Sequence, residues 1–275
     1  MIERSGFLRN VRTGFLALVT ILYLVPFALI VLNSFKSSPQ IIENPLALPS
    51  PIGIGTFAHA YVAMSYVAAF FNSLIVTVCS VVLIVVVSSM TAHLFVRRAT
   101  RLSQFLFLLM VSSMLIPFQA IMIPLVKIYG SLKMLDSKWT LIYMYIGFGS
   151  SFAVFIFHGF IKGVPLELEE AATIDGSSPL QTFFLIVFPL LKTTIVTVVT
   201  LDVLWIWNDF LLPSLVLIAP LERTLPLSTY AFFGTYTVQY GQLMAALVMT
   251  VAPLIVLYVF LQRHVIRGIT EGSIK

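Results

Sequence analysis

Six long stretches of mostly apolar residues run through this chain, and they constrain its fold more than any other feature. A helix rises about 1.5 Å per residue, so roughly 20 apolar residues are needed to cross a bilayer core of about 30 Å. The stretches lie at about Thr13–Asn33, Phe70–Val96, Ser103–Lys127, Trp139–Ile161, Phe184–Leu212 and Leu243–Gln262. We therefore expect an all-α polytopic protein with six transmembrane helices in a single transmembrane domain.

The composition agrees with a lipid environment. Of the 275 residues, 59% are hydrophobic and only 10% are charged, whereas soluble domains carry about 25% charged residues. A chain with so few polar groups cannot cover a water-facing surface, so the lipid bilayer is its expected solvent. The net charge of +5 comes mainly from basic residues at the ends of the stretches. That pattern orients membrane proteins, and we expect no nucleic-acid partner.

The basic residues also predict the topology. They are enriched before the first stretch, after the second and after the sixth, at Arg4, Arg9, Arg12, Arg97, Arg98, Arg101, Arg263, Arg267 and Lys275. The long segment Ser34–Ala69 holds only Lys36. Because cytoplasmic connections collect Lys and Arg, we expect a cytoplasmic N-terminus over residues 1–12, a membrane domain over 13–262 and a cytoplasmic tail over 263–275. No small-residue cleavage site follows the first stretch, so we interpret it as a retained span rather than a signal peptide.

One predicted cytoplasmic connection, residues 162–183, is unusually acidic. Pro165 suits the first position of a helix, and Glu167 and Glu169 would lie near the positive end of its dipole. Gly176 is a C-terminal stop signal, which gives a helix of about three turns. Ser178, Pro179 and Gln181 then form the capping-box pattern of a second helix, which leads into the fifth stretch. The loop is predicted to be a helix, a glycine turn and a helix.

This loop resembles a motif of the permeases of ATP-binding-cassette (ABC) importers. That motif reads Glu-Ala-Ala, three residues, Gly, nine residues, Ile, and Leu-Pro two positions on. Here the corresponding residues are Glu170-Ala171-Ala172, Gly176, Ile186 and Phe188-Pro189. Phe188 replaces the favoured leucine, one apolar residue for another. The resemblance covers most of the chain and implies a type I ABC importer permease fold.

Further segments resemble the smaller six-span permease of the maltose-type, carbohydrate-importing branch. They are Phe71-Asn72-Ser73, Trp207-Asn208-Asp209-Phe210, Thr224-Leu225-Pro226-Leu227 and the tail from Gln262 to Lys275. The spacing of the loop indicates an importer permease. The tail and the Trp-Asn-Asp segment indicate a sugar substrate.

The resemblance implies a mechanism and partners. Such a chain lies in a prokaryotic inner membrane and pairs with a second permease, two cytoplasmic ATPase subunits and an extracytoplasmic sugar-binding protein. Its loop sits in a cleft of one ATPase, with Glu167, Glu169, Glu170, Ala171, Ala172, Asp175 and Gly176 as the expected coupling residues. The tail, with Arg263, Arg267, Gly268 and Lys275, lies between the ATPase subunits. No G-x-x-x-x-G-K-[ST] motif occurs in the chain, so ATP and Mg²⁺ are expected on the partner subunits and not on this chain, which is not itself an enzyme.

Asn72, Gly149, Asp202, Trp205 and Asn208 are the candidates for the translocation pathway. An acid inside a span is costly and often functional, but Asp202 could equally bond a partner helix or face a water-filled cleft. Trp205 and Asn208 could contact a sugar, or the tryptophan could anchor the span at the interface. The small residues around Gly149, and the prolines at 117 and 124 of the third stretch, could serve close packing or a kinked segment that lines the pathway.

An aromatic external segment holds the candidate contact with the binding protein. Phe232, Phe233, Gly234, Thr235 and Tyr236 either reach into that protein, as the resemblance implies, or form a surface lid. The four histidines have no second ligand at metal spacing, so we expect no metal site.

Two other classes of protein stay open at this point. An ion-coupled secondary transporter would need coupling carboxylates in the membrane and usually two related halves. Only Asp202 is clearly intramembrane, and no internal repeat is visible. A membrane-embedded enzyme would need a cluster of His, Asp or Glu near the interface.

Overall fold

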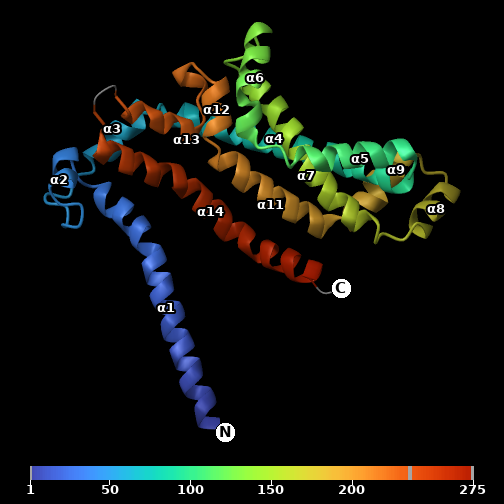
Figure 1. Cartoon of the computed structure of the whole chain (residues 1–275), viewed down its shortest axis with the longest axis horizontal. Coiled ribbons are helices and arrows are strands. Elements are labelled where there is room, and N and C mark those ends of the chain that lie inside the picture. Colours follow the sequence, from blue (N-terminus) through green and yellow to red (C-terminus); the bar gives the residue numbers. More distant parts are fainter. Residues whose placement is uncertain (1, 235–236, 274–275) are drawn as a thin grey trace. The chain divides into compact units, whose positions relative to one another are not determined.

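The computed structural model is almost entirely helical, as predicted. It describes the backbone of residues 2–234 and 237–273, with side chains for residues 10–234, 237–256, 258 and 259. A single antiparallel bridge, Phe233 with Val238, is the one β-type pairing in that part of the chain. The helical elements in chain order are α1 (Ile2–Asn33), α2 (Ser38–Glu43), α3 (Gly55–Ala63), α4 (Tyr66–Arg97), α5 (Arg101–Ser113), α6 (Phe118–Ser131), α7 (Lys138–Ile161), α8 (Glu167–Ile174), α9 (Pro179–Thr182), the π-helical η1 (Phe183–Val187), α10 (Phe188–Leu190), α11 (Lys192–Asn208), α12 (Leu211–Val216), η2 (Pro220–Glu222), α13 (Leu225–Ser228), η3 (Thr229–Phe232) and α14 (Tyr240–Ser273) (Figure 1).

A helix occupies each of the six predicted positions, but not all of these helices are long and straight. Three uninterrupted helices are long and apolar enough to cross a membrane, namely Asn10–Asn33, Tyr66–Arg97 and Lys138–Ile161. Two bent helix pairs pass the same test when each pair is counted as one span. In the sixth stretch the described residues form a shorter apolar helix, Tyr240–Val256. Length and composition therefore give three to five spans in the described chain. The count of six stays a prediction.

The third predicted span, Ser103–Lys127, is not one straight helix. α5 ends at Ser113 and α6 begins at Phe118, and their axes differ by 101°. Pro117 lies at the break, with an extended backbone (φ −62°, ψ 134°). Proline has no N–H to donate and disfavours helical geometry at the preceding residue, which explains why the helix stops here. Pro124, by contrast, lies inside α6.

The fifth predicted span, Phe184–Leu212, is also bent. The helical segment that begins at Pro179 ends at Leu190, and α11 leaves it at 78°. The π-helical turns of η1, which precede this bend, were not predicted. π-Helical turns are rare and occur often at functional sites.

The chain forms two compact units, and we describe each by itself. The first comprises Met1–Tyr66 and Ser228–Pro253. In it the buried ammonium of Lys36 donates to the main-chain oxygens of Asn44 and Pro45, at 3.3 and 3.2 Å. Ser34 accepts a hydrogen bond from the hydroxyl of Thr56 through its main-chain oxygen. These bonds hold part of the segment between α1 and α4 in a compact fold.

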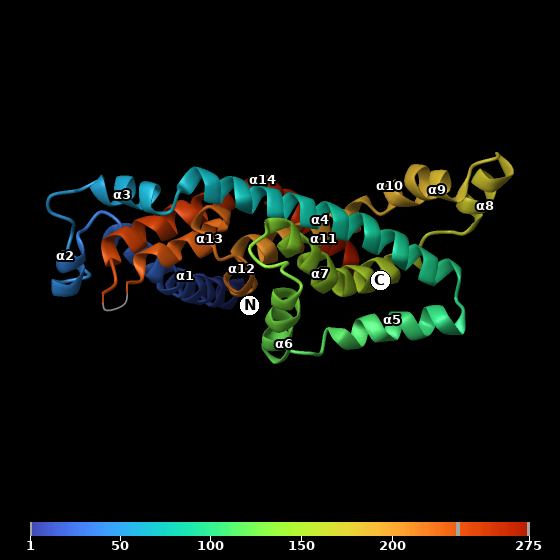
Figure 2. The same ribbon diagram turned by 90° about the horizontal axis from the view of Figure 1, so that it is seen from above.

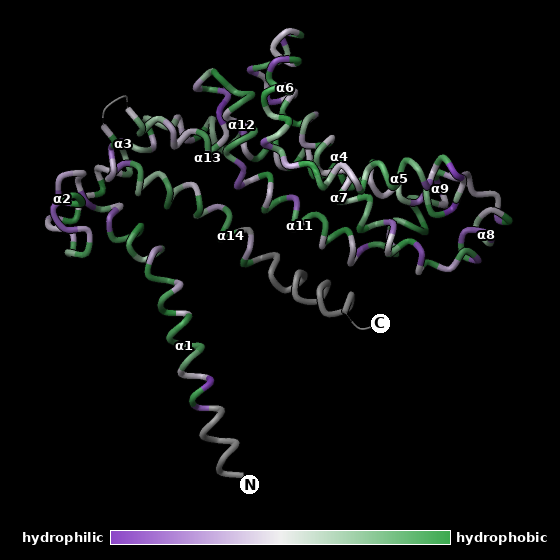
Figure 3. The backbone as a smooth tube through the Cα atoms, viewed as in Figure 1, coloured by the Kyte–Doolittle hydropathy of each residue, from purple (hydrophilic) through white to green (hydrophobic). Residues whose placement is uncertain are grey.

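The second unit comprises Val67–Leu227 and Leu254–Lys275. Its core is built from α4, α7 and α11, and Figure 3 shows how strongly hydrophobic residues dominate α4 and α7. Fully buried side chains include Ile84, Tyr145 and Phe157. Many other apolar side chains are exposed: Val82 of α4 is 55% exposed and Leu108 of α5 is 64% exposed. In a membrane protein such surfaces face lipid or a partner helix, which is the arrangement that the composition requires.

The predicted domain boundaries do not coincide with helix ends. The boundary between residues 12 and 13 lies within α1, and the boundary between 262 and 263 lies within α14. The helices therefore continue through the expected limits of the membrane domain.

Candidate functional site

The acidic loop folds as a short helix closed by a glycine turn. α8 runs from Glu167 to Ile174 and so has about two turns rather than three. Pro165 precedes the helix instead of opening it, because Leu166 is the N-cap. At the other end Gly176 has φ +85°, a conformation that residues with a Cβ rarely adopt.

Two main-chain hydrogen bonds close α8. The N–H of Gly176 donates to the oxygen of Thr173 at 3.1 Å, and the N–H of Ser177 donates to the oxygen of Ala172 at 2.9 Å. This is the pairing of a Schellman motif, in which a left-handed glycine satisfies the last carbonyl groups of a helix. The glycine turn predicted from the sequence is therefore present, and it sets the direction in which the chain leaves α8.

The second arm of the loop begins with the predicted cap. The main-chain N–H of Gln181 donates to the hydroxyl of Ser178 at 3.4 Å, and the N–H of Ser178 donates to the side-chain oxygen of Gln181 at 2.8 Å. This reciprocal pair is the capping box. The arm then continues from α9 through η1 and α10 toward α11. α8 and α9 both lie near the C-terminal end of α4 (Figure 2).

The three glutamates of α8 lie in different environments. Glu167 and Glu170 are exposed, whereas Glu169 is buried. The two alanines differ as well, since Ala171 is exposed and Ala172 is buried.

Within the predicted coupling set, Glu167, Glu170, Ala171, Asp175 and Gly176 therefore present a surface, and Glu169 and Ala172 face the fold. Figure 3 shows α8 as one of the more hydrophilic parts of the second unit.

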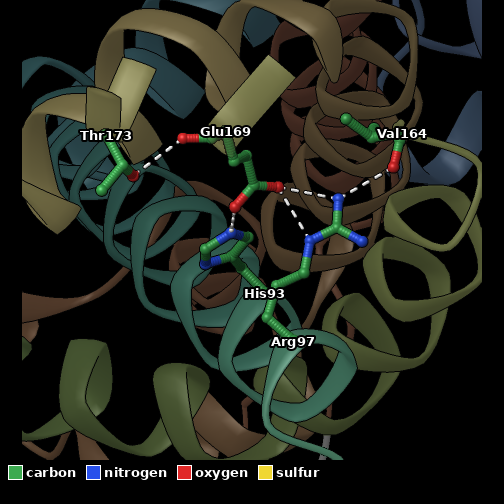
Figure 4. Close-up of polar contacts among 5 residues, drawn as sticks. All are labelled: His93, Arg97, Val164, Glu169 and Thr173. Carbon is green, nitrogen blue, oxygen red and sulfur yellow. Dashed lines mark hydrogen bonds and ion pairs between the residues drawn. The ribbon is translucent and has the colours of Figure 1, made fainter. Parts of the chain in front are cut away.

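The carboxylate of Glu169 meets two basic side chains of α4 (Figure 4). Its Oε2 lies 2.8 Å from Nε2 of His93. Its Oε1 accepts from Nε of Arg97 at 2.8 Å and lies 2.7 Å from Nη2 of the same residue. Nη2 also donates to the main-chain oxygen of Val164 at 2.8 Å. We call these three side chains, Glu169, His93 and Arg97, the α4–α8 clamp.

Neither α4 member of the clamp is predicted from the sequence, in which Arg97 indicates only membrane orientation and His93 has no second ligand at metal spacing. One signal was available: both residues lie at the end of the second predicted span that was expected to be cytoplasmic, on the side where the acidic loop was expected. They are also four residues apart, which places them on one face of a helix.

A cavity of about 940 Å³ lies in the second unit, between α5 and α6 on one side and α7 and α11 on the other. Its polar lining includes Asp202, Trp205, Ser113 and Ser151, and its apolar lining comes mainly from the broken third helix and from α7. Asp202 is only 2% exposed, and its Oδ2 has no hydrogen-bond partner in the described chain. An unpartnered carboxylate oxygen in a cavity is costly, which marks this position as a candidate ligand contact.

Gly149 is the third pathway candidate that lines this cavity. A Cβ built on Gly149 would lie 2.6 Å from Cδ1 of Ile84 and 3.4 Å from the ring of Trp205. α7 is not kinked here, since it runs uninterrupted from Lys138 to Ile161. The small residues of α7 therefore serve close helix packing and line the cavity at the same time, and the kinked segment considered from the sequence is not found in α7.

The other two pathway candidates lie elsewhere. Asn72 is buried, and its Nδ2 donates to the main-chain oxygens of Leu221 and Arg223 at 2.7 and 3.2 Å. Its Oδ1 accepts from Nζ of Lys138 at 2.9 Å. Asn72 thus fixes the loop after α12 to α4. Asn208 is exposed and donates to the main-chain oxygen of Leu204 at 2.7 Å.

The segments that resemble sugar permeases also hold the second unit together. Ser73 accepts a hydrogen bond from the N–H of Leu225 at 2.7 Å. Asp209 accepts from the hydroxyl of Tyr145 at 2.8 Å and from the N–H of Leu211 at 2.9 Å. Trp207 is buried, with its ring 6.0 Å from that of Phe70. These residues are thus part of the internal packing.

The aromatic segment that was predicted to be external is divided between core and surface. Phe232 is 1% exposed and Phe233 is 48% exposed. The N–H of Gly234 donates to the main-chain oxygen of Thr237 at 2.9 Å. Thr235 and Tyr236 lie outside the described residues. Of the predicted tail contacts, Lys275 and the side chains of Arg263 and Arg267 also lie outside them, and Gly268 belongs to the same end of α14.

No group of three metal-binding side chains occurs among the described residues.

Comparisons with known proteins show which family the chain belongs to. Residues 84–271 match the family described as binding-protein-dependent transport system inner membrane component. The probable starch degradation products transport system permease protein AmyC of Thermoanaerobacterium thermosulfurigenes is 40% identical, over 95% of each chain. The multiple sugar-binding transport system permease protein MsmG of Streptococcus mutans is 34% identical, over 93% of each chain. The melibiose/raffinose/stachyose import permease protein MelC of Bacillus subtilis is 30% identical, over 98% of this chain and 100% of that one.

A solved structure shares the fold. It belongs to a bacterial ABC transporter involved in the import of the acidic polysaccharide alginate, and it matches with a TM-score of 0.79 and 21% identity, over 92% of this chain and 94% of that one. The chain is therefore a multi-pass membrane protein of the binding-protein-dependent transport system inner membrane component family, with the fold of an ABC importer permease.

Proposed function

We propose that this chain is a permease subunit of an ATP-driven importer of oligosaccharides. The observation that carries the proposal is the 40% identity, over 95% of both chains, with a permease named for the transport of starch degradation products. Other relatives are named for several sugars and for the melibiose, raffinose and stachyose group. What these substrates share is a chain of hydroxyl-rich sugar rings, so oligosaccharides are the proposed substrate class.

The acidic loop supports a role in coupling to an ATPase. Its exposed acids, Glu167, Glu170 and Asp175, form a charged surface, and the exposed Ala171 would let a partner approach the helix closely. In the proposal this surface docks into a cleft of a cytoplasmic ATPase subunit that binds ATP and Mg²⁺. Two such subunits, a second permease and an extracytoplasmic sugar-binding protein complete the importer. Both termini are cytoplasmic in this arrangement, and the tail contacts the ATPases.

The cavity of the second unit supports a role in the sugar pathway. Trp205 offers an aromatic face, which stacks well on a sugar ring, and Asp202 offers a carboxylate oxygen without a partner in the described part of the chain. Ser113 and Ser151, whose hydroxyls lie 3.0 Å apart, add further hydrogen-bonding groups. Closure of the ATPases would turn the pathway outward, and hydrolysis would turn it inward again, as in alternating access.

Transport by the reconstituted complex tests the proposal. Proteoliposomes would contain this chain, its partner permease and the ATPase, with the binding protein added outside. The measurement is ATP-dependent uptake of labelled maltotriose, with unlabelled raffinose and an unlabelled arabinooligosaccharide as competitors. We expect uptake that needs ATP, Mg²⁺ and the binding protein. Uptake of amino acids or ions in place of every saccharide tested would refute the substrate class.

A further inference from the structure

The α4–α8 clamp joins the acidic loop to one particular helix of the membrane domain. Both carboxylate oxygens of Glu169 are engaged, one by Nε2 of His93 at 2.8 Å and the other by Nε and Nη2 of Arg97 at 2.8 and 2.7 Å. The side chains are largely withdrawn from solvent, with exposures of 11% for Glu169, 20% for His93 and 18% for Arg97. A charged pair with this little exposure is weakly screened and geometrically specific. Solvent and salt therefore screen the ion pair of Glu169 and Arg97 less than an exposed ion pair.

Two further contacts hold the loop at the same place. Nη2 of Arg97 donates to the main-chain oxygen of Val164, in the segment that leads into α8 (Figure 4). The ring of His93 lies 5.3 Å from the ring of Phe183, which belongs to η1 on the second arm of the loop. His93 and Arg97 therefore contact the entry to the loop, its helix and its exit. In the described chain, α4 is the helix whose side chains hold the loop by an ion pair.

We propose that His93 and Arg97 are positioning residues of the coupling loop, which lock α8 to α4 so that the two helices move as one body. This inference rests on the proposed function, because it states how motion of the loop reaches the membrane domain. It assigns Glu169 an internal role that differs from the docking role of the exposed Glu167 and Glu170.

α4 is suited to carry such a motion. It is continuous over 32 residues, from Tyr66 to Arg97, and contains neither Gly nor Pro. Kinks in helices arise almost always at such residues or at π-helical turns, so a helix without them transmits displacement along its length of about 48 Å.

The far end of α4 is attached as firmly as the end that bears the clamp. Asn72 donates to the main-chain oxygens of Leu221 and Arg223, and Ser73 accepts from the N–H of Leu225. Lys138 of α7 joins the same group, with Nζ 2.9 Å from Oδ1 of Asn72 and 3.4 Å from Oε2 of Glu222. A displacement of α8 carried by α4 would therefore reach the loop between α12 and α13.

Arg98 provides a matched control. It is the next residue after Arg97 and carries the same charge at the same end of α4, but its side chain is exposed and has no hydrogen bond or ion pair within the described part of the chain. Replacing either arginine removes one positive charge from the same connection, so any effect on membrane orientation is shared. Only the replacement of Arg97 breaks the clamp.

The experiment compares His93→Ala/Arg97→Ala with Arg98→Ala in the complete reconstituted complex. Three quantities are measured: retention of the ATPase, the rate of ATP hydrolysis, and labelled maltotriose imported per ATP hydrolysed. We expect the double variant to keep the ATPase and to hydrolyse ATP, while maltotriose per ATP falls about tenfold or more. Arg98→Ala should stay within about twofold of the unmodified complex, as surface substitutions usually do. An unchanged ratio in the double variant would overturn the inference.

If the double variant loses the ATPase, a cross-link between α4 and α8 tests whether the two helices move together. His93→Cys and Glu169→Cys are combined with Cys79→Ser, which removes the chain's only native thiol, and are bridged by a short, reducible, bifunctional thiol reagent. If α4 and α8 move together, bridging raises maltotriose per ATP and reduction lowers it again. If bridging instead stops transport, α8 must separate from α4 during the cycle and the inference is wrong. Cys79→Ser alone, treated with the same reagent, is the control for other cysteines of the complex.

The two proposals fail in different ways. If the complex with the unmodified chain imports no labelled saccharide, the proposed function is wrong, whatever the clamp variants do. If the unmodified complex imports maltotriose and the clamp variant imports it equally well, the inference is wrong and the proposed function stands.

Discussion

Gly149 of α7 packs directly against Ile84 of α4. A Cβ on Gly149 would lie 2.6 Å from Cδ1 of Ile84 and 3.4 Å from its Cγ1. Ile84 is fully buried, so its side chain has little room to move away. The absence of a side chain at position 149 therefore lets two long helices of the second unit approach closely, in the way that small residues allow in membrane proteins.

Gly149→Val should destabilise the permease by about 1–3 kcal/mol, the usual cost of overpacking a tight core. Gly159→Ala is the matched control, since Gly159 lies on the same helix and a Cβ there would meet nothing within 4 Å. It should leave the stability unchanged or raise it by about 0.5–1 kcal/mol, because glycine in a helix is entropically costly. The measurement is thermal unfolding of the purified protein in detergent. Equal unfolding temperatures for both variants would show that the contact with Ile84 relaxes freely.

Gly176→Val should disrupt the loop and leave the membrane helices intact. Gly176 has φ +85°, and forcing a β-branched residue into this region costs about 1–3 kcal/mol. The second arm would leave α8 in the wrong direction, so the ATPase should detach or hydrolyse ATP without transport. Copurification of the ATPase and uptake of labelled saccharide are measured together.

Gly176→Asn is the informative comparison for that variant, because asparagine tolerates left-handed backbone better than other residues with a side chain. It should restore most of what valine removes. Normal copurification and uptake in Gly176→Val would mean that the loop is not the coupling element.

The loop also shows how far the sequence could predict this protein. The glycine turn and the capping box are local devices, since each is made by residues within six positions of one another, and both were predicted. The family motif around Glu170 and Gly176 gave the class of transporter, which the comparisons confirm. The sites assigned to Glu167, Glu170 and the tail stay predictions.

What the sequence could not predict depends on contacts between distant residues. Glu169 meets Arg97 across 72 positions, and Asn72 meets Leu221 across 149. The sequence shows the charge and polarity of each position but not its partner, so neither of these two contacts was predicted. The bend at Pro117 was one of the two alternatives left open for the prolines of the third stretch. The bend near Leu191 was missed, because hydropathy measures how apolar a segment is and does not report its direction.

The predicted topology can be checked by reporters fused at two positions. A fusion after Arg98 should be cytoplasmic and a fusion near Pro51 should be external, because the connection after the second helix is rich in arginine and the segment before it is not. The measurement is the paired activity of a cytoplasm-specific and a periplasm-specific reporter at each site. If both fusions report the same side, α4 does not cross the membrane and the six-span arrangement is wrong.

Asp202 provides a prediction in which stability and transport should respond differently. The residue is 2% exposed, it lines the cavity, and its Oδ2 has no hydrogen-bond partner in the described chain. If Asp202 served only the fold, its buried oxygen without a hydrogen-bond partner would only lower the stability of the protein. Replacing it with an apolar residue of similar size should then be neutral or stabilising.

We therefore expect Asp202→Leu to unfold at the same temperature as the unmodified permease or at a slightly higher one. Its uptake of labelled maltotriose should fall by about tenfold or more, because a buried polar contact to the ligand is removed. Asp202→Asn keeps a side chain of the same shape that can still bond a hydroxyl, so it should retain more transport than the leucine variant. Unfolding temperature and initial uptake rate are measured on the same preparations. Undiminished uptake by Asp202→Leu would exclude Asp202 from the sugar pathway. A marked fall in its unfolding temperature only when the second permease is present would instead assign the carboxylate to the contact between the two permeases.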